Sequence, residues 1–168
     1  MERVRSYDPA DWQAFFVAII SAAAALTGLL FVAVSINLDR ILKAATFLPT
    51  RAAETLSSLL LIVVTAALVL VPQNLRLLGL EILVLAVPML VVTLRNQLGY
   101  RHRNPNDPLL WLISRMTCTA AATVPAVLAG LSLAVHWGGG LYWLAVTALL
   151  GIIGAVYGAW VLLIEIVR

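Results

Sequence analysis

Ionisable side chains in or beside long apolar runs are the residues of this sequence most able to do chemistry. Glu81, Arg115 and His136 each lie in or next to a stretch of Leu, Val, Ala and Ile. A charged group inside a bilayer is costly, and such residues commonly mark an ion path, a proton relay or a substrate site. Each of the three also has a simpler structural interpretation.

Glu81 is the strongest candidate. It lies about two turns into its apolar run, where it is either an ion or proton site or an interface carboxylate close to Arg76. Arg115 lies equally deep in another run and is either an interface anchor or a gating charge. His136 precedes Trp137, and such pairs can gate protons. Adjacent helical residues do not face each other, however, so we expect an interface histidine.

Signatures of catalysis and of cofactor binding are missing from the sequence. HExxH, Walker and GxSxG motifs do not occur, and Ser21 and Ser35 have no histidine or lysine in their own run to activate them. The single cysteine, Cys118, excludes a cysteine-based metal centre within one chain. The two histidines, His102 and His136, fall on opposite membrane sides. We therefore expect no catalytic residues, no metal, no cofactor and no enzyme activity.

Small residues line one face of the first apolar run. Ser21, Gly28 and Ser35 are spaced by seven, which keeps them near one side of a helix. Lipid does not require a small face, whereas a close helix neighbour or a pore does. Asp39 ends the run, and a ring of such acids in an oligomer could concentrate cations. These four residues are the candidates for pore lining or gating.

The composition is that of an integral membrane protein. The chain has 168 residues, of which 62% are hydrophobic and 11% are charged, against about 25% charged in soluble domains. The net charge of +3 comes from basic residues between the apolar runs rather than in one patch. This distribution indicates a lipid bilayer as partner and argues against nucleic acid.

Five uncharged or nearly uncharged runs predict an all-α membrane protein with a single domain of about five transmembrane helices. The predicted spans are residues 14–38, 52–71, 75–94, 109–137 and 141–167. Pro72 and Gly138–Gly140 mark tight turns between spans.

Ladders of small residues predict how the spans pack. The fourth span has small residues at every fourth position, and the fifth has a GxxxG motif with a further glycine. These ladders are Ala122, Ala126, Gly130 and Ala134, and Gly151, Gly154 and Gly158. We expect the first, fourth and fifth helices to be close-packed, with the second and third as a peripheral hairpin. Alternatively, one of these ladders forms the contact between copies of the chain in a homo-oligomer.

Basic residues predict the orientation. Three of the eleven Lys and Arg residues, Arg3, Arg5 and Arg76, share the membrane side of the N-terminus, and the other eight lie opposite. The positive-inside rule therefore places the N-terminus outside and the C-terminus inside.

The run AAAALTGLLFVAVSINLDRIL followed by LPTRAAETL resembles small bacterial membrane proteins, some of them labelled modulators of the FtsH protease. This resemblance covers about the first third of the chain and implies a location in the bacterial inner membrane. The first span is also similar to that of the Orai calcium channels, whose first helix lines the pore of a hexamer. That resemblance implies that Ser21, Gly28 and Ser35 line a pore near Asp39. The fifth span and the inside location of Asp39 depart from the Orai pattern.

The leading hypothesis is a homo-oligomeric channel for ions or small solutes, with the first helix around the axis. The alternative is a membrane-embedded protein that regulates a protease or another membrane complex. A pore requires Ser21, Gly28 and Ser35 to face a solvated axis, whereas the regulator predicts that they are buried against the protomer's own helices.

Overall fold

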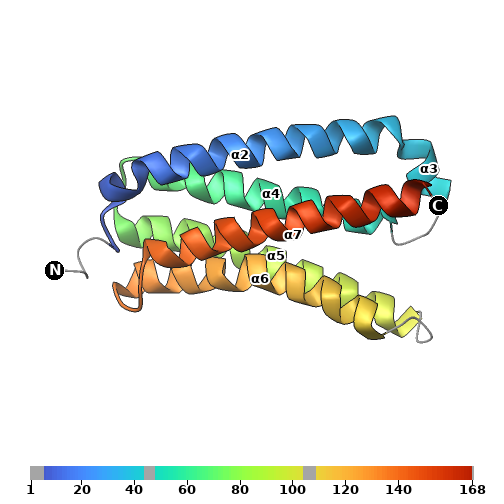
Figure 1. Cartoon of the computed structure of the whole chain (residues 1–168). Coiled ribbons are helices and arrows are strands. Elements are labelled where there is room, and N and C mark those ends of the chain that lie inside the picture. The colour runs from blue at the N-terminus through green and yellow to red at the C-terminus, as the bar shows by residue number, and fades with distance from the viewer. Residues whose placement is uncertain (1–5, 44–47, 104–108, 168) are drawn as a thin grey trace.

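The computed structural model describes residues 6–43, 48–103 and 109–167, which are helical apart from short turns (Figure 1). The helices are α2 (Pro9–Ile36), α3 (Leu38–Lys43), α4 (Leu48–Leu70), α5 (Leu75–Arg103), α6 (Leu109–Val135) and α7 (Leu141–Val167). Within this part of the chain, five helices, all except α3, are long and apolar enough to cross a bilayer. The predicted all-α, five-span architecture is confirmed, and the chain is a multi-pass membrane protein.

The ends of the helices follow local chemistry. At the start of α2 the Asp8 side chain accepts a hydrogen bond from the amide of Ala10 at 3.0 Å, and Pro9 occupies the first helical position. α5 continues to Arg103, beyond the predicted end of the span at residue 94. Polar residues end a membrane span without ending the helix, because Arg, Asn and Gln are all compatible with helical backbone. Arg3 and Arg5, which bear on the orientation, lie outside the described residues.

Neighbouring helices occur in the order α2, α4, α7, α6 and α5, each packed on the next (Figure 1). The predicted packing of the fourth span on the fifth is therefore correct. The prediction for the other helices was wrong. α2 lies against α4 and touches α7 only slightly, and α4 and α5 make few contacts with each other. α4 is central rather than peripheral, because its apolar residues contact α2 on one side and α7 on another.

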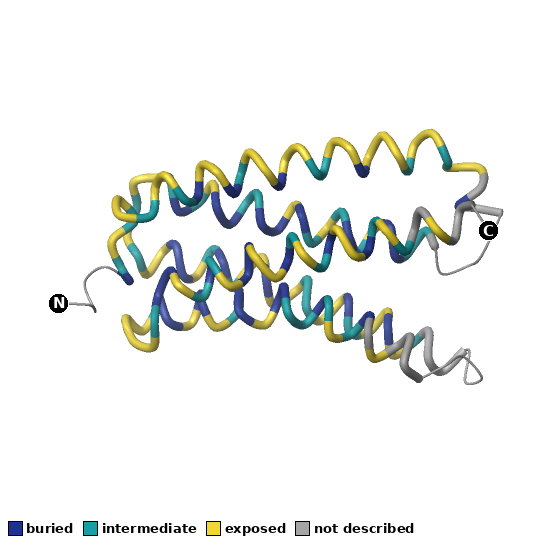
Figure 2. The backbone as a smooth tube through the Cα atoms, in the orientation of Figure 1, coloured by how far each residue is buried: buried dark blue, intermediate teal, exposed yellow. Residues whose placement is uncertain are grey.

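α2 is the helix least covered by the rest of the protein. Only 17% of its most apolar segment is buried, compared with 50% for α6. Its buried residues, Phe16, Ile19, Ala23 and Leu30, all belong to the main core cluster. The opposite side of α2 is exposed along its whole length (Figure 2).

The small-residue ladder of α6 packs mainly on α5, where the backbones approach most closely. A Cβ atom at Gly79 would lie 2.7 Å from the carbonyl oxygen of Gly130 and from the amide nitrogen of Ala134. One turn earlier, Ala126 clusters with Ala86 of α5. The ladder thus serves α5 instead of α2, because α5 has small residues at the matching heights.

The glycines of α7 place that helix between α4 and α6. Cβ atoms at Gly151 and Gly158 would come within 2.6 and 2.8 Å of side chains of α4. Gly154 faces α6, and Ala122 of α6 would lie 3.5 Å from a Cβ at Gly151. All these ladder residues therefore act within one protomer.

The segment before α2 is attached to the turn between α6 and α7. The amide of Leu141 donates to the carbonyl oxygen of Ser6 at 2.8 Å, and the Tyr7 hydroxyl lies 3.2 Å from Oγ of Ser132. The amide of Gly140 donates to the same Ser132 oxygen at 2.8 Å. This hydrogen-bonded group, Ser6, Tyr7, Ser132, Gly140 and Leu141, is called the N-terminal anchor below.

We predict that Gly79→Leu lowers the stability of the protein by at least about 3 kcal/mol, because the new side chain meets backbone atoms that cannot move aside. Gly99→Leu is the matched control, since a Cβ at Gly99 meets nothing within 4 Å. Thermal unfolding in detergent measures the melting temperatures of the two purified variants. Equal melting temperatures for the two variants would contradict the close α5–α6 crossing.

Candidate functional sites

The outward face of α2 contains the predicted pore-lining residues. Ser21 and Gly28 lie two positions before Ala23 and Leu30, about 200° around the helix, and so point away from α4. Ser21, Gly28 and Ser35 are all exposed, and a Cβ at Gly28 would meet nothing within 4 Å. The structure therefore does not bury this stripe against the protomer's own helices.

The stripe is longer than these three residues. Exposed small residues repeat along the same face of α2 at alternating intervals of four and three, and a valine fills one position. This outer stripe consists of Ala14, Ala18, Ser21, Ala25, Gly28, Val32 and Ser35. Other exposed faces carry larger aliphatic side chains, such as Leu80 and Val84 of α5, which are 54% and 70% exposed. The pattern matches the heptad spacing of packed helices and differs from that of a lipid-facing surface.

Asp39 lies in α3, just beyond the C-terminal end of the outer stripe, and its side chain is exposed. The hydroxyl of Ser21 donates to the carbonyl oxygen of Val17 at 2.9 Å, so its oxygen remains available as an acceptor on the outer face. The stripe thus presents hydroxyl groups at two depths and an acid at one end.

A buried ion pair joins α6 to α4. Arg115 donates through Nε and Nη2 to the two carboxylate oxygens of Glu54 at 2.8 and 2.6 Å. The two side chains are 3% and 12% exposed. Arg115 therefore faces the interior of the bundle, whereas the sequence suggested an anchor at the interface. A bidentate pair of this kind holds both charges in fixed positions and satisfies them where water is scarce.

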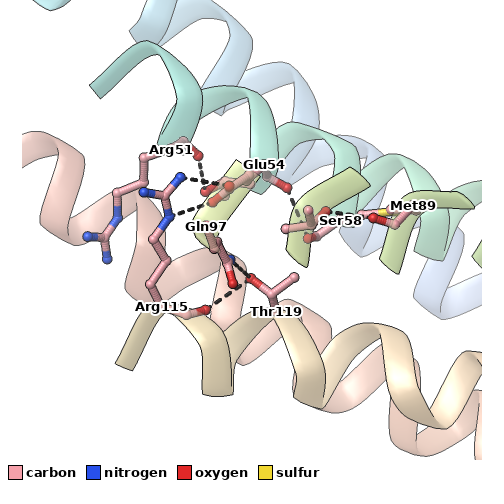
Figure 3. A network of polar contacts seen from close by, with 9 residues as sticks. Arg51, Glu54, Ser58, Met89, Gln97, Arg115 and Thr119 are labelled. Atoms are coloured by element: carbon pink, nitrogen blue, oxygen red, sulfur yellow. Dashed lines mark hydrogen bonds and ion pairs between the residues drawn. The ribbon is translucent and has the colours of Figure 1, made fainter. Parts of the chain in front are cut away.

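Further polar side chains surround the ion pair (Figure 3). Gln97 of α5 is fully buried and donates to Oγ1 of Thr119 at 2.9 Å, and Thr119 donates to the Arg115 carbonyl oxygen at 3.0 Å. Arg51 is also buried and lies one turn before Glu54 on α4. This polar cluster, made of Arg51, Glu54, Gln97, Arg115 and Thr119, connects α4, α5 and α6 near the end of the bundle where α4 and α6 begin.

The sequence did not predict the pairing of Glu54 with Arg115, and the signal for it lies in where the two helices begin in the structure. α4 and α6 begin on the same membrane side, at Leu48 and Leu109. Both charges lie six residues after the first residue of their helix, and therefore at the same depth. Opposite charges at equal depth in two spans that run in the same direction are candidates for a buried pair.

Glu81 is partly buried in α5 and accepts a hydrogen bond from Nε2 of Gln73 at 2.8 Å. Gln73 also donates to the Leu68 carbonyl oxygen at 3.2 Å. The carboxylate therefore stabilises the turn between α4 and α5, and its partner is Gln73 rather than Arg76.

His136 lies after the end of α6, in left-handed backbone with φ of 58°. The amide of Trp137 donates to the Ser132 carbonyl oxygen at 3.1 Å, which is the hydrogen bond of a Schellman motif. The exposed His136 ring stacks on Tyr7 with centroids 6.1 Å apart. His136 thus belongs to the surface of the α6–α7 turn and is outside the apolar bundle.

Comparisons with known proteins were made at the level of sequence families, of curated proteins and of solved structures. No match was found in any of them. The resemblances to FtsH modulators and to Orai channels therefore stay predictions. Among the described residues, no group of three or more His, Cys, Asp or Glu side chains could hold a metal ion.

We predict that Glu54→Gln destabilises the protein by about 3 kcal/mol, because it leaves the Arg115 charge buried without its carboxylate. Glu81→Gln, a matched change in the neighbouring span, should cost less than about 1 kcal/mol, since an amide oxygen can still accept from Gln73. Denaturation in mixed micelles measures the free energy of unfolding of both variants. Combining Glu54→Leu with Arg115→Leu should cost less than the sum of the single changes, and strict additivity would contradict the pairing.

Proposed function

We propose that the protein is a homo-oligomeric channel for ions or small solutes, in which α2 of each copy lines a central axis. The observation that carries this proposal is the outer stripe, an exposed face of small residues on the most peripheral span. Small side chains allow several copies of α2 to approach one another around an axis. The Ser21 and Ser35 hydroxyls would then offer oxygen ligands along it.

The packing of the other helices supports this role, because their small residues already make contacts within one protomer. The ladders of α6 and α7 pack on α5, α4 and each other within one protomer. The outer stripe is therefore not needed to hold the protomer together. Asp39 would lie close to the inner mouth of the pore, where a ring of acids attracts cations.

The proposed setting is a bacterial cytoplasmic membrane, with the N-terminus outside. We expect Asp11→Cys, in a Cys118→Ala background, to react with an impermeant thiol reagent added to intact cells. Asp11 suits this test because it is exposed in the first turn of α2, whereas Ser6 is buried in the N-terminal anchor. Labelling only after lysis would show that the N-terminus lies inside instead.

The oligomer is tested by cross-linking. Ser21→Cys in the same Cys118→Ala background should form disulfide-linked dimers on mild oxidation in membranes, because the stripes of neighbouring copies meet at the axis. Val84→Cys is the control, since this residue is 70% exposed on a face of large aliphatic residues. Cross-links to a different membrane protein would favour the regulatory alternative, and equal dimer yields at both positions would contradict a specific α2 interface.

Transport is tested separately with Gly28→Leu. The fold should tolerate this change, because a Cβ at Gly28 meets nothing within 4 Å, and the melting temperature should stay close to that of the wild type. Ion flux through liposomes containing the variant should nevertheless fall at least about tenfold, because the side chain narrows the axis. Flux equal to that of the wild type, or no flux in the wild type under any ion gradient, would overturn the channel proposal.

A further inference from the structure

A groove lies between α4 and α5, two helices that make few contacts with each other. It has a volume of about 390 Å³, and all of its described lining residues belong to these two helices. Ala53 and Ser57 of α4 and Val92 and Asn96 of α5 are exposed at its rim, whereas Thr93 is buried. Because both helices are membrane spans, the groove opens sideways towards lipid.

The groove reaches about halfway through the bilayer. Its lining on α5 runs from Pro88 to Asn96, which is eight residues or about 12 Å along the helix. The hydrocarbon core is about 30 Å thick, so one leaflet takes about 15 Å. Beyond the groove, Leu61 of α4 and Ala86 of α5 are buried in one cluster with Ala126 of α6. The groove therefore matches a lipid tail of one leaflet and is too short for another spanning helix.

The separation of α4 from α5 follows from the course of the helices. The α5–α6 pair diverges from α4 and α7 towards the end where α5 ends and α6 begins (Figure 1). Pro88, which lines the groove, removes one backbone hydrogen bond from α5 and so makes a bend possible there.

Polar and basic residues gather at the membrane-surface end of the groove. Thr50 lies in the first turn of α4, and Asn96 lies just after the predicted end of its span at residue 94. Their side chains can donate hydrogen bonds to phosphate or ester oxygens. Arg95 is exposed, and Arg101 and Arg103 follow in the last turn of the same helix. Basic residues at this level attract anionic lipid headgroups.

The deeper part of the groove suits an acyl chain. Pro88, Met89 and Val92 form an apolar wall on α5. Among the described residues that line the groove, the one charged side chain is Glu54, whose carboxylate is paired with Arg115. An acyl chain over this pair would exclude water from it, so the groove can hold a lipid without leaving the Glu54 charge uncompensated.

We propose that this groove binds one anionic phospholipid of the adjacent leaflet. The headgroup lies at Thr50, Arg95 and Asn96, and one acyl chain runs along Met89 and Val92. The lipid fills the gap between α4 and α5 and stabilises the end of the bundle that contains the polar cluster. This role does not depend on whether the protein is a channel.

The test uses the purified full-length protein in detergent, titrated with phosphatidylglycerol or with phosphatidylcholine that has the same acyl chains. The melting temperature should rise with phosphatidylglycerol and then saturate, because a ligand of the folded state stabilises it. Phosphatidylcholine should stabilise the protein less. Native mass spectrometry should detect one retained phosphatidylglycerol per protomer.

Ala53→Phe should raise the half-saturating concentration of phosphatidylglycerol at least about tenfold, because its ring occupies the groove. Ala67→Phe is the matched control. Ala67 is also exposed on α4, fourteen residues further along, and it does not line the groove. This control variant should therefore respond as the wild type does.

Arg95→Gln gives a second readout that does not depend on filling the groove. It should raise the half-saturating concentration of phosphatidylglycerol about fivefold and change that of phosphatidylcholine little, because it removes one cation near the headgroup. Arg76→Gln, at the other end of α5, should leave both unchanged.

The proposal is overturned if phosphatidylglycerol does not stabilise the wild type, if Ala53→Phe responds as the wild type does, or if the two lipids act equally. Disulfide-linked dimers of Ser57→Cys in a Cys118→Ala background would assign the groove to a second copy of the chain and would also overturn it.

Discussion

A bilayer supplies almost no hydrophobic driving force between helices, and the whole fold depends on that constraint. Helices in lipid associate where their backbones can approach closely, so contact is made at small residues. The Gly79–Gly130 crossing joins α5 to α6, and Gly151 and Gly158 join α7 to α4. Large aliphatic residues occupy the remaining surface. The positions of glycine and alanine, more than those of leucine, therefore decide which helix lies next to which.

The same constraint explains what the sequence could predict. The five spans follow from hydropathy, and the α6–α7 hairpin follows from its ladders and three-glycine turn. The neighbours of α2 and α5 could not be predicted in the same way. Gly79, Ala86 and Thr93 repeat at the same interval as Ser21, Gly28 and Ser35, yet α5 buries its set whereas α2 exposes its own. Spacing identifies a small face on a helix without identifying what covers it.

The partners of the ionisable residues likewise could not be predicted from their positions in the sequence. Glu81 and Arg115 were candidates because each lies inside a span, but their partners depend on helix rotation and depth. Arg115 turns inward to Glu54, whereas Glu81 supports a turn through Gln73. The equal depth of Glu54 and Arg115 was not visible in the sequence, because the predicted second span begins at residue 52 whereas α4 begins at Leu48. The rotation that brings the two side chains face to face was not visible either, because it depends on α7, which packs against both α4 and α6.

The N-terminal anchor fixes the rotation of α2 about its own helix axis. A helix in contact with one neighbour on a single apolar face can roll about its own axis at little energetic cost. Hydrogen bonds that link Ser6 and Tyr7 with the α6–α7 turn oppose such rolling at one end, because they join α2 to helices it otherwise scarcely touches. The protomer therefore presents its outer stripe in one fixed direction. In the proposed oligomer, association would join surfaces that are already oriented.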